Sequence, residues 1–181
     1  MIRKLYKKHS HIFPAVVIIA ALALLASAPF LSSAEEAKVA ENASHPVGVW
    51  LKIVKNEHKL YVMKNASAVA AYPVAIGKNQ GQKLKAGDCR TPEGKFFVQQ
   101  VQDARSWTHD FKDGKGVIQN AYGPWFIRLK TQWSGIGIHG THDPASIGSN
   151  ATEGCIRLRN ENLRTLKENY IKRGMAVWIL P

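Results

Sequence analysis

A cysteine and a histidine stand sixteen positions apart in the glycine-rich segment 135–159, as Cys155 and His139. A thiolate is a reactive nucleophile, and a nearby imidazole can generate it by taking the proton of the thiol. Gly154 directly precedes the cysteine and lets the backbone turn tightly or approach a substrate closely, because glycine has no Cβ atom. These residues suggest a cysteine nucleophile with a histidine base. A structural free cysteine is the alternative, since buried cysteines are common.

The same segment permits a second interpretation, a metal site. His139 and His142 form an H-x-x-H pair, Asp143 follows at once, and Cys155 adds a further candidate ligand. Imidazole nitrogen, carboxylate oxygen and thiolate sulfur are the usual ligands of zinc. Two histidines three positions apart on a loop are a weak metal signal, so we expect no metal here.

Cys155 and Cys89 are the only two cysteines of the chain. In an oxidising compartment two cysteines usually form a disulfide. Such a bond would block a nucleophile at Cys155, so the disulfide and the catalytic interpretation exclude each other. Cys89 lies in the turn-rich segment 87–94, where a free thiol and a redox partner are both open interpretations.

Short alternating segments separated by turns must position these residues. Alternation of apolar and polar residues predicts strands, and their number and spacing favour a mainly β sheet or sandwich domain. Pro73 indicates a sheet edge or a bulge, because proline cannot donate to the ladder. The turn signature at 91–94 leads into one of the strands. The expected strands are 47–54, 59–64, a pair within 68–77, 95–102, 123–130 and a buried one at 135–140.

One helix is predicted directly after the cysteine segment. Asn160 is a good N-cap residue, and Glu161 places an acid in the first turn. Leu163, Leu166 and Tyr170 fall on one face. Gly174 is expected to end the helix, and 176–180 to return as a closing strand.

The beginning of the chain has the composition of an export signal. A basic start is followed by an apolar stretch at 12–25 and by small residues that suit a cleavage site. We therefore expect a signal peptide over 1–34, or a membrane anchor if the segment is not cleaved. Residues 35–46 are expected to form a linker and 47–181 the folded domain. The positive-inside rule then places that domain outside the cytoplasm, in the periplasm or on the cell-wall face of the inner membrane.

The net charge of the exported part indicates which classes of partner it can bind. The whole chain carries +12, and four of its 25 basic but none of its 13 acidic residues lie before residue 35, which leaves +8 after it. A positive surface concentrates anionic partners. Nucleic acid does not fit an exported chain, and no nucleic-acid-binding motif is visible. A carboxylate-rich cell wall or an anionic lipid surface fits better.

The residues around the cysteine resemble the active-site signature of the YkuD-type L,D-transpeptidases, bacterial enzymes that remodel peptidoglycan. The resemblance rests on His-Gly-Thr at 139–141, Asp-Pro-Ala-Ser-Ile-Gly at 143–148 and Thr-x-Gly-Cys-Ile-Arg at 152–157. It extends more weakly over 47–181. Glu153 is a departure, because many members have a histidine at that position.

The resemblance implies a role for each matching residue. Cys155 resembles the nucleophile and His139 the base that takes its proton. The carbonyl of Gly140 resembles the group that fixes the tautomer of the imidazole. Backbone N–H groups at Gly154 and Cys155 are implied as the oxyanion site.

Two further residues are implied on the substrate side of the site. Thr152 is grouped with the oxyanion and substrate-binding residues. Arg157 resembles a residue that fixes the site or binds a substrate carboxylate, for which a planar guanidinium is well suited. A structural ion pair is the alternative role of Arg157.

The resemblance also implies a fold and a reaction. The fold is a β-sandwich with one C-terminal helix after the active-site loop and a closing strand. In the reaction, the cysteine forms a thioester with the diaminopimelate carbonyl of a peptidoglycan tetrapeptide stem and releases D-alanine. An amine of a second stem then gives a 3→3 cross-link, and no metal or cofactor takes part. The alternatives are an L,D-carboxypeptidase, a hydrolase or transferase of protein–peptidoglycan links, and a non-catalytic wall-binding module.

Overall fold

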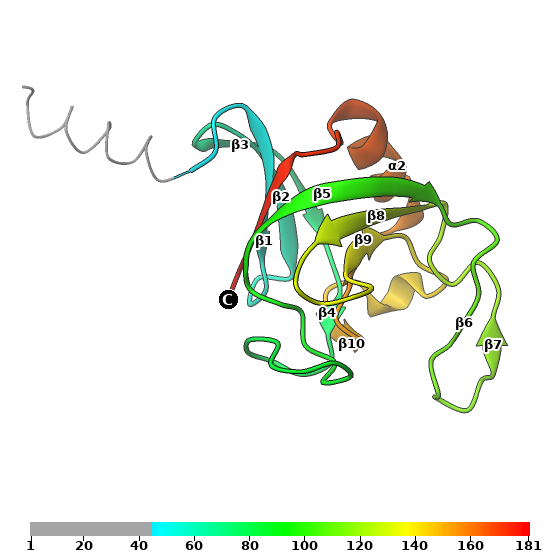
Figure 1. Ribbon diagram of the computed structural model, residues 1–181. Coiled ribbons are helices and arrows are strands. Elements are labelled where there is room, and N and C mark those ends of the chain that lie inside the picture. Colours follow the sequence, from blue (N-terminus) through cyan, green and yellow to red (C-terminus); the bar gives the residue numbers. More distant parts are fainter. Residues whose placement is uncertain (1–44) are drawn as a thin grey trace, which may run out of the picture.

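One eight-stranded mixed sheet, curled on itself, organises residues 45–181, the part of the chain that this computed structural model describes (Figure 1). The strand order is β11-β9-β8-β5-β12-β1-β2-β3. The strands are β1 Val49–Val54, β2 Lys59–Lys64, β3 Ser67–Pro73, β5 Gly94–Asp103, β8 Trp125–Lys130, β9 Gly137–His139, β11 Ile156–Arg157 and β12 Ala176–Leu180. The expected signal segment 1–34 and most of the linker lie outside the described residues.

Smaller elements surround this sheet. Strand β4 (Ile76–Gly77) pairs with β10 (Asn150–Thr152), and β6 (His109–Asp110) forms a hairpin with β7 (Val117–Ile118). The α-helix α2 covers Asn160–Asn169, and a short 3-10 helix covers Pro144–Ser146. The expected mainly β fold with one helix after the cysteine segment is therefore confirmed. No helix within 45–181 has the length and apolar character needed to cross a membrane.

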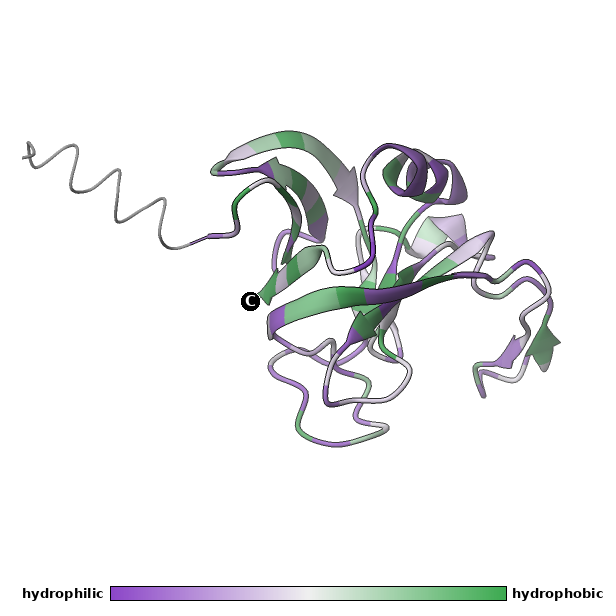
Figure 2. Cartoon of the chain, turned by 45° about the horizontal axis from the view of Figure 1, so that its top comes forward, coloured by the Kyte–Doolittle hydropathy of each residue, from purple (hydrophilic) through white to green (hydrophobic). Residues whose placement is uncertain are grey.

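Alternation along the strands builds the core, as the bands of hydropathy in Figure 2 show. Every second residue of β1, β2 and β12 points inward and is fully buried: Leu51, Ile53, Leu60, Val62, Val177 and Ile179. Leu163 and Leu166 of α2 close the core with 0% exposure. Burying one such side chain stabilises the fold by about 1.5–3 kcal/mol, so this face fixes the register of the whole sheet.

Strand β3 is one of the two edge strands of the sheet and ends at Pro73, in agreement with the edge position that the proline predicted. The expected closing strand at 176–180 is also present, as β12, but it lies in the middle of the sheet. It pairs in parallel with β1 and antiparallel with β5. Its two buried side chains, Val177 and Ile179, join the core there.

Two expectations about the helix are wrong. Arg159, with an extended backbone, is the N-cap, and it makes no side-chain cap. Asn160 is already helical, and its side chain is used elsewhere, as described below. The helix also ends at Asn169, before Gly174, because Tyr170 leaves the helical conformation and packs with Ile171 against the core. Gly174, at φ +82°, belongs to the turn that precedes β12.

Candidate active site

The reactive residues lie on one face of the sheet, where β9 and β11 run side by side. The two strands are parallel, with Arg157 opposite His139 and Ile156 opposite Ile138. Both isoleucines are fully buried in the core. Because side chains alternate, His139, Arg157 and the preceding Cys155 all point to the other face. There the three residues line a cavity of about 510 Å³.

His139 is held in one tautomer by the main chain. Its Nδ1 lies 2.6 Å from the carbonyl oxygen of Gly140, and only 2% of the residue is exposed. A carbonyl accepts but does not donate, so the proton must be on Nδ1. Nε2 is therefore left as an acceptor, which is the form a general base requires. This is the contact that the resemblance implied for Gly140.

Two aromatic rings enclose the imidazole. Phe126 stacks on it with ring centroids 5.5 Å apart, and Tyr122 approaches edge-on at 4.9 Å. The stacked ring lies over Gly137, where a Cβ atom would stand 2.3 Å from it, so only glycine fits between. Burial lowers the pKa of His139 to about 3, and the Gly140 carbonyl only partly opposes this. The imidazole is thus neutral at ordinary pH.

Cys155 carries a neutral thiol in this resting state. Its Sγ donates to the carbonyl of Gly135 at 3.2 Å. The residue is only partly exposed, and its sulfur is desolvated by the surrounding side chains. Desolvation raises the pKa of Cys155 to about 11. A hydrogen bond from the N–H of Gly137 opposes this rise. A neutral thiol and a neutral imidazole therefore share the cavity, and proton transfer must accompany the attack.

The loop before the nucleophile is tied together by Thr152. Its buried hydroxyl donates to the carbonyl of Cys155 at 2.6 Å and accepts the N–H of Gly154 at 3.1 Å. The expected use of the Gly154 N–H for an oxyanion is therefore wrong in this state, because Thr152 occupies it. The N–H of Cys155 has no partner within the described residues and is the available donor. Thr152 itself holds the loop and lines the cavity.

Glycine at position 154 is required by its surroundings. It has φ +131°, a conformation that side-chain-bearing residues rarely adopt. A Cβ atom would also stand 2.9 Å from the carbonyl oxygen of Arg90. Gly154 therefore lets the segment before the nucleophile pack directly on the loop that carries Arg90.

Arg157 is a buried cation without an anionic partner in the described part of the chain. It is 3% exposed, and its Nη1 donates to Ser146 Oγ at 3.0 Å. Its Nε has no hydrogen-bond partner, and its guanidinium lies 5.5 Å from the ring of Phe111. The alternative role in a structural ion pair is not found. Burying an uncompensated charge is costly, so this end of the cavity is complementary to a carboxylate.

Glu153, the departure from the expected active-site signature, binds the β6–β7 hairpin. Its carboxylate lies 2.9 Å from Nε2 of His109 on β6. Phe111, in the same hairpin, stacks on His142 with centroids 5.0 Å apart. The β6–β7 hairpin thus forms one wall of the cavity, and Glu153 holds it from the loop of the nucleophile.

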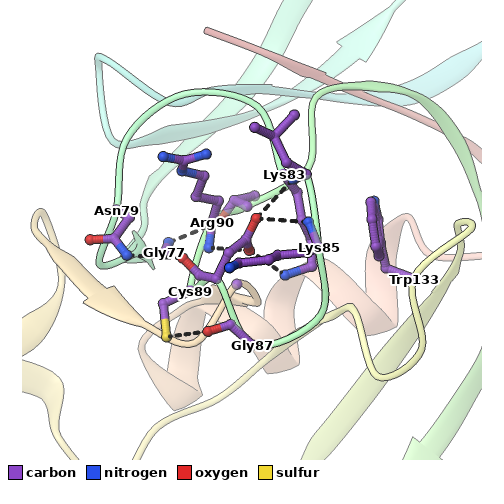
Figure 3. A network of polar contacts seen from close by, with 12 residues as sticks. Gly77, Asn79, Lys83, Lys85, Gly87, Cys89, Arg90 and Trp133 are labelled. Carbon is purple, nitrogen blue, oxygen red and sulfur yellow. Dashed lines mark hydrogen bonds and ion pairs between the residues drawn. The ribbon is translucent and has the colours of Figure 1, made fainter.

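A polar network organises the opposite wall, the loop 78–93 (Figure 3). The carboxylate of Asp88 binds Nζ of Lys83 at 2.6 Å and three backbone N–H groups, those of Leu84, Lys85 and Arg90. These contacts hold the pKa of Asp88 well below its usual range, against the effect of desolvation. Lys83 also lies over the ring of Trp133, 5.5 Å from its centroid. The loop is therefore fixed against Trp133, another aromatic residue that lines the cavity.

Cys89 lies in this wall and is a free thiol, as is Cys155. The disulfide that the sequence left open as an alternative is not formed. Cys89 has φ +53°, a left-handed conformation, and its Sγ is 3.6 Å from the carbonyl of Gly87 (Figure 3). Cys89 therefore forms part of a tight left-handed turn, and its thiol contacts the loop backbone at Gly87.

The alternative metal site is not assembled. Nδ1 of His139 is bound to Gly140, whereas Nδ1 of His142 lies 3.2 Å from the carbonyl of Ala121. Between residues 45 and 181, no three histidine, cysteine, aspartate or glutamate side chains come close enough to hold a metal ion. The two histidines of the H-x-x-H pair therefore have separate roles: His139 lines the cavity, and His142 packs against the hairpin.

Asn160 is a site residue that the sequence reasoning assigned wrongly. Its Oδ1 accepts the N–H of Thr141 at 2.8 Å, and its Nδ2 donates to the carbonyl of Thr141 at 3.0 Å. A Cβ atom on Gly140 or Gly123 would stand 2.1 or 2.2 Å from that Oδ1. Asn160 thus fixes the segment that presents the Gly140 carbonyl to His139.

The aromatic residues of the cavity were also missed, although part of the signal was present. Alternation within the predicted strand 123–130 places Phe126 and Arg128 on the same face, and both line the cavity. Tyr122 precedes that strand and gave no comparable signal. Its ring edge against His139 results from the turn at 120–123.

Comparison with known proteins agrees with this arrangement. Residues 48–179 match the model of the YkuD family, described as the L,D-transpeptidase catalytic domain. A protein of Bacillus licheniformis is 29% identical over 126 residues, covering 70% of this chain and 62% of that protein. One of Bacillus subtilis is 31% identical over 115 residues, covering 64% and 56%. Both are named after the L,D-transpeptidase YkuD, and this chain spans less than two thirds of the length of either.

Solved structures share the fold. The L,D-transpeptidase of Xylanimonas cellulosilytica has a TM-score of 0.55 and 18% identity, over 75% of this chain and 62% of that one. The catalytic domain of the E. faecium L,D-transpeptidase has a TM-score of 0.56 and 16% identity, over 75% of this chain and 99% of that domain. At these identities the similarity concerns the architecture.

Proposed function

This chain belongs to the YkuD family of L,D-transpeptidase catalytic domains, and we propose from that premise that it is a peptidoglycan L,D-transpeptidase with Cys155 as its nucleophile. One observation carries the proposal. A histidine whose Nδ1 is fixed by a main-chain carbonyl shares a face of the sheet, and a cavity, with a cysteine. That pairing fits a thiol activated by an imidazole base.

In the first step Cys155 attacks the carbonyl between diaminopimelate and D-alanine in a tetrapeptide stem. Nε2 of His139 takes the thiol proton as the sulfur–carbon bond forms, and then gives it to the leaving D-alanine amine. The free N–H of Cys155 is positioned to donate to the developing oxyanion. Each such donor contributes about 2.7–4 kcal/mol in serine enzymes, so one donor is a substantial contribution. The product is a thioester on Cys155.

Arg157 binds a carboxylate of the donor stem in this proposal. The guanidinium is buried and has an unpaired Nε. A stem peptide carries several carboxylates, and placing one against Arg157 removes the cost of an uncompensated buried charge. This contact would also orient the stem along β11, toward Cys155.

In the second step an amine of a neighbouring stem attacks the thioester and releases the thiol. With diaminopimelate as the acceptor, the product is a 3→3 cross-link. A cavity enclosed by the hairpin and by the loop 78–93 favours an amine over water, because it limits the access of solvent. No step of this scheme uses a metal or a cofactor. Since its substrate is outside the cytoplasm, we propose that the protein acts there.

The test is a reaction of the full chain with purified disaccharide-tetrapeptide stems. We expect release of D-alanine, a mass increase on Cys155 equal to the acyl group of one disaccharide-tripeptide, and dimers linked 3→3. Cys155→Ala should abolish all three, whereas Cys89→Ser should retain them. Release of D-alanine without dimers would identify a carboxypeptidase. A folded wild-type protein that gives neither product nor adduct would contradict the proposal and point to a wall-binding module.

A further inference from the structure

The face of the sheet that carries Cys155 continues far beyond the cavity. Four residues on neighbouring strands stand in direct register across it: Lys95 on β5, Trp178 on β12, Lys52 on β1 and Tyr61 on β2. Cations and rings therefore alternate in a line perpendicular to the strands. We call these four residues the lysine–aromatic row.

The row is on the surface because its neighbours along each strand are the core residues. Leu51 and Ile53 on either side of Lys52, and Val177 and Ile179 beside Trp178, are fully buried. The row residues themselves are partly or fully accessible. The cations lie over the rings, with Nζ of Lys95 4.2 Å from the centroid of Trp178 and Nζ of Lys52 5.1 Å from that of Tyr61.

Neither lysine of the row is neutralised by an acid in the described part of the chain. Glu93, the nearest carboxylate on the loop side, is bound to Lys55 at 2.6 Å. Glu57, at the other end, accepts the hydroxyl of Tyr61. Lys52 and Lys95 consequently present unpaired positive charge next to partly exposed rings, in a chain whose exported part is expected to be basic.

A second cavity, of about 520 Å³, joins the row to the site of Cys155. It is lined by Lys95, by Phe97 (52% exposed), by Lys130 and by Trp133. Trp133 also lines the cavity of Cys155. Phe97 stands opposite Lys130 in the ladder, so the alternation of cation and ring continues on this side. The surface is thus continuous from the nucleophile to β2.

We propose that the lysine–aromatic row binds a carboxylate-bearing stretch of glycan: backbone sugars that have lost their stem peptides and so carry free carboxylates, next to the stem that enters the cavity of Cys155. The inference rests on the proposed function for its choice of polymer. Neighbouring strands are about 4.8 Å apart, close to the length of one pyranose residue, so successive sugars meet successive row positions. Aromatic rings bind the apolar faces of sugars, and lysines bind their carboxylates.

Binding requires only a local exchange. A cation over a partly exposed ring is held only weakly, so each ammonium group leaves its ring readily. The sugar then covers the ring, and the lysine pairs with a carboxylate of the glycan. A membrane surface is a poorer match, because the row lies flat within a sheet and has no protruding amphipathic element.

The test measures binding of the full chain carrying Cys155→Ala to fluorescent glycan strands from which an amidase has removed the stem peptides. Without stems, the cavity of Cys155 is not engaged. We expect the Lys52→Glu, Lys95→Glu double variant to bind about tenfold more weakly, with binding of the parent falling as salt is raised. Lys167→Glu is the control for one such charge reversal, since Lys167, on α2, also lies over a ring, that of Trp125 on β8, but outside the row.

Trp178→Ala, checked for an unchanged melting profile, should also weaken binding. Equal binding of the double variant and its parent would overturn the proposal. So would tighter binding to phosphatidylglycerol vesicles, lost in the same double variant. In an active Cys155 background, the double variant should still release D-alanine from free stems. A wild-type protein that releases D-alanine but binds no glycan would refute the row alone, whereas one that binds glycan without reacting would refute the proposed function alone.

Discussion

The side chain of Asn160 binds both main-chain polar groups of Thr141: its Oδ1 accepts the N–H at 2.8 Å, and its Nδ2 donates to the carbonyl at 3.0 Å. This pair links the first turn of α2 to the segment that follows β9. Gly140 lies between His139 and Thr141, and its carbonyl is the acceptor of the imidazole N–H. The helix therefore fixes the tautomer of the base through two consecutive main-chain contacts.

Replacing Asn160 should consequently affect catalysis as well as stability. Asn160→Ala leaves the N–H and the carbonyl of Thr141 unpaired, and we expect the free energy of unfolding to fall by about 1–3 kcal/mol. The Gly140 carbonyl loses its fixed position, so release of D-alanine should fall by about 100-fold, a loss typical of a displaced catalytic group. Denaturant unfolding and single-turnover acylation measure the two effects.

Asn162→Ala is the matched control for this prediction. Asn162 lies one half-turn further along the same helix, and its side chain makes no hydrogen bond within residues 45–181. We expect near wild-type acylation in this variant. If Asn160→Ala acylates Cys155 as fast as Asn162→Ala does, the position of the Gly140 carbonyl does not depend on Asn160.

The hydroxyl of Thr152 is expected to be essential for the shape of the nucleophile loop. Thr152→Val keeps the volume but removes the acceptor of the Gly154 N–H and the donor to the Cys155 carbonyl. A buried unpaired group costs about 1–3 kcal/mol, and the loop should relax. We expect slower acylation of Cys155 by about 10-fold or more. Thr152→Ser retains the hydroxyl and should restore the rate, and failure of serine to do so would show that the methyl group matters instead.

Much of this site follows from local sequence pattern, and the rest depends on contacts between distant segments. Alternation predicted the strands that carry Phe126 and His139, because an apolar core face leaves a period of two in the sequence, whereas the two short strands on either side of Cys155, β10 and β11, were not predicted. Asn160 was misassigned because asparagine is also a good N-cap residue, and only the fold brings Thr141 to it. The N–H of Gly154 was expected to face an oxyanion, but it binds the hydroxyl of Thr152 two residues earlier, a local turn contact that competes with that role.

The position of β12 illustrates the same limit. The strand was predicted with its correct bounds, yet its apolar pattern does not specify its neighbours. Parallel pairing with β1 joins residues more than a hundred positions apart. The lysine–aromatic row exists only through that pairing, so no inspection of the separate segments would have revealed it.

The resting thiol should react with small alkylating agents as an ordinary, protonated cysteine. The pKa of Cys155 is raised to about 11 by desolvation, and that of His139 is lowered to about 3. The thiolate fraction then grows about tenfold with each pH unit below 11. In the Cys89→Ser variant, which leaves one thiol, we expect the rate with iodoacetamide to rise in this way from pH 7 to pH 10. A rate that is already level near pH 7 would instead indicate a thiolate–imidazolium pair.

Burial of a neutral His139 should make the protein sensitive to acid. In the unfolded chain a histidine binds its proton near pH 6.5, whereas His139 in the folded protein does so only near pH 3. Between these values the unfolded state binds more protons, so the stability of the fold decreases as the pH falls. At pH 5 this one residue costs about 2 kcal/mol relative to pH 7.

A pair of denaturant titrations isolates this contribution. His139→Gln cannot bind the proton, so its free energy of unfolding should change less between pH 7 and pH 5 than that of the wild type, by about 2 kcal/mol. Every other titrating group is common to the two proteins and cancels in the comparison, whatever the substitution does to stability at pH 7. Parallel pH dependences would mean that the imidazole accepts a proton readily in the folded state, and that Tyr122 and Phe126 do not keep it neutral.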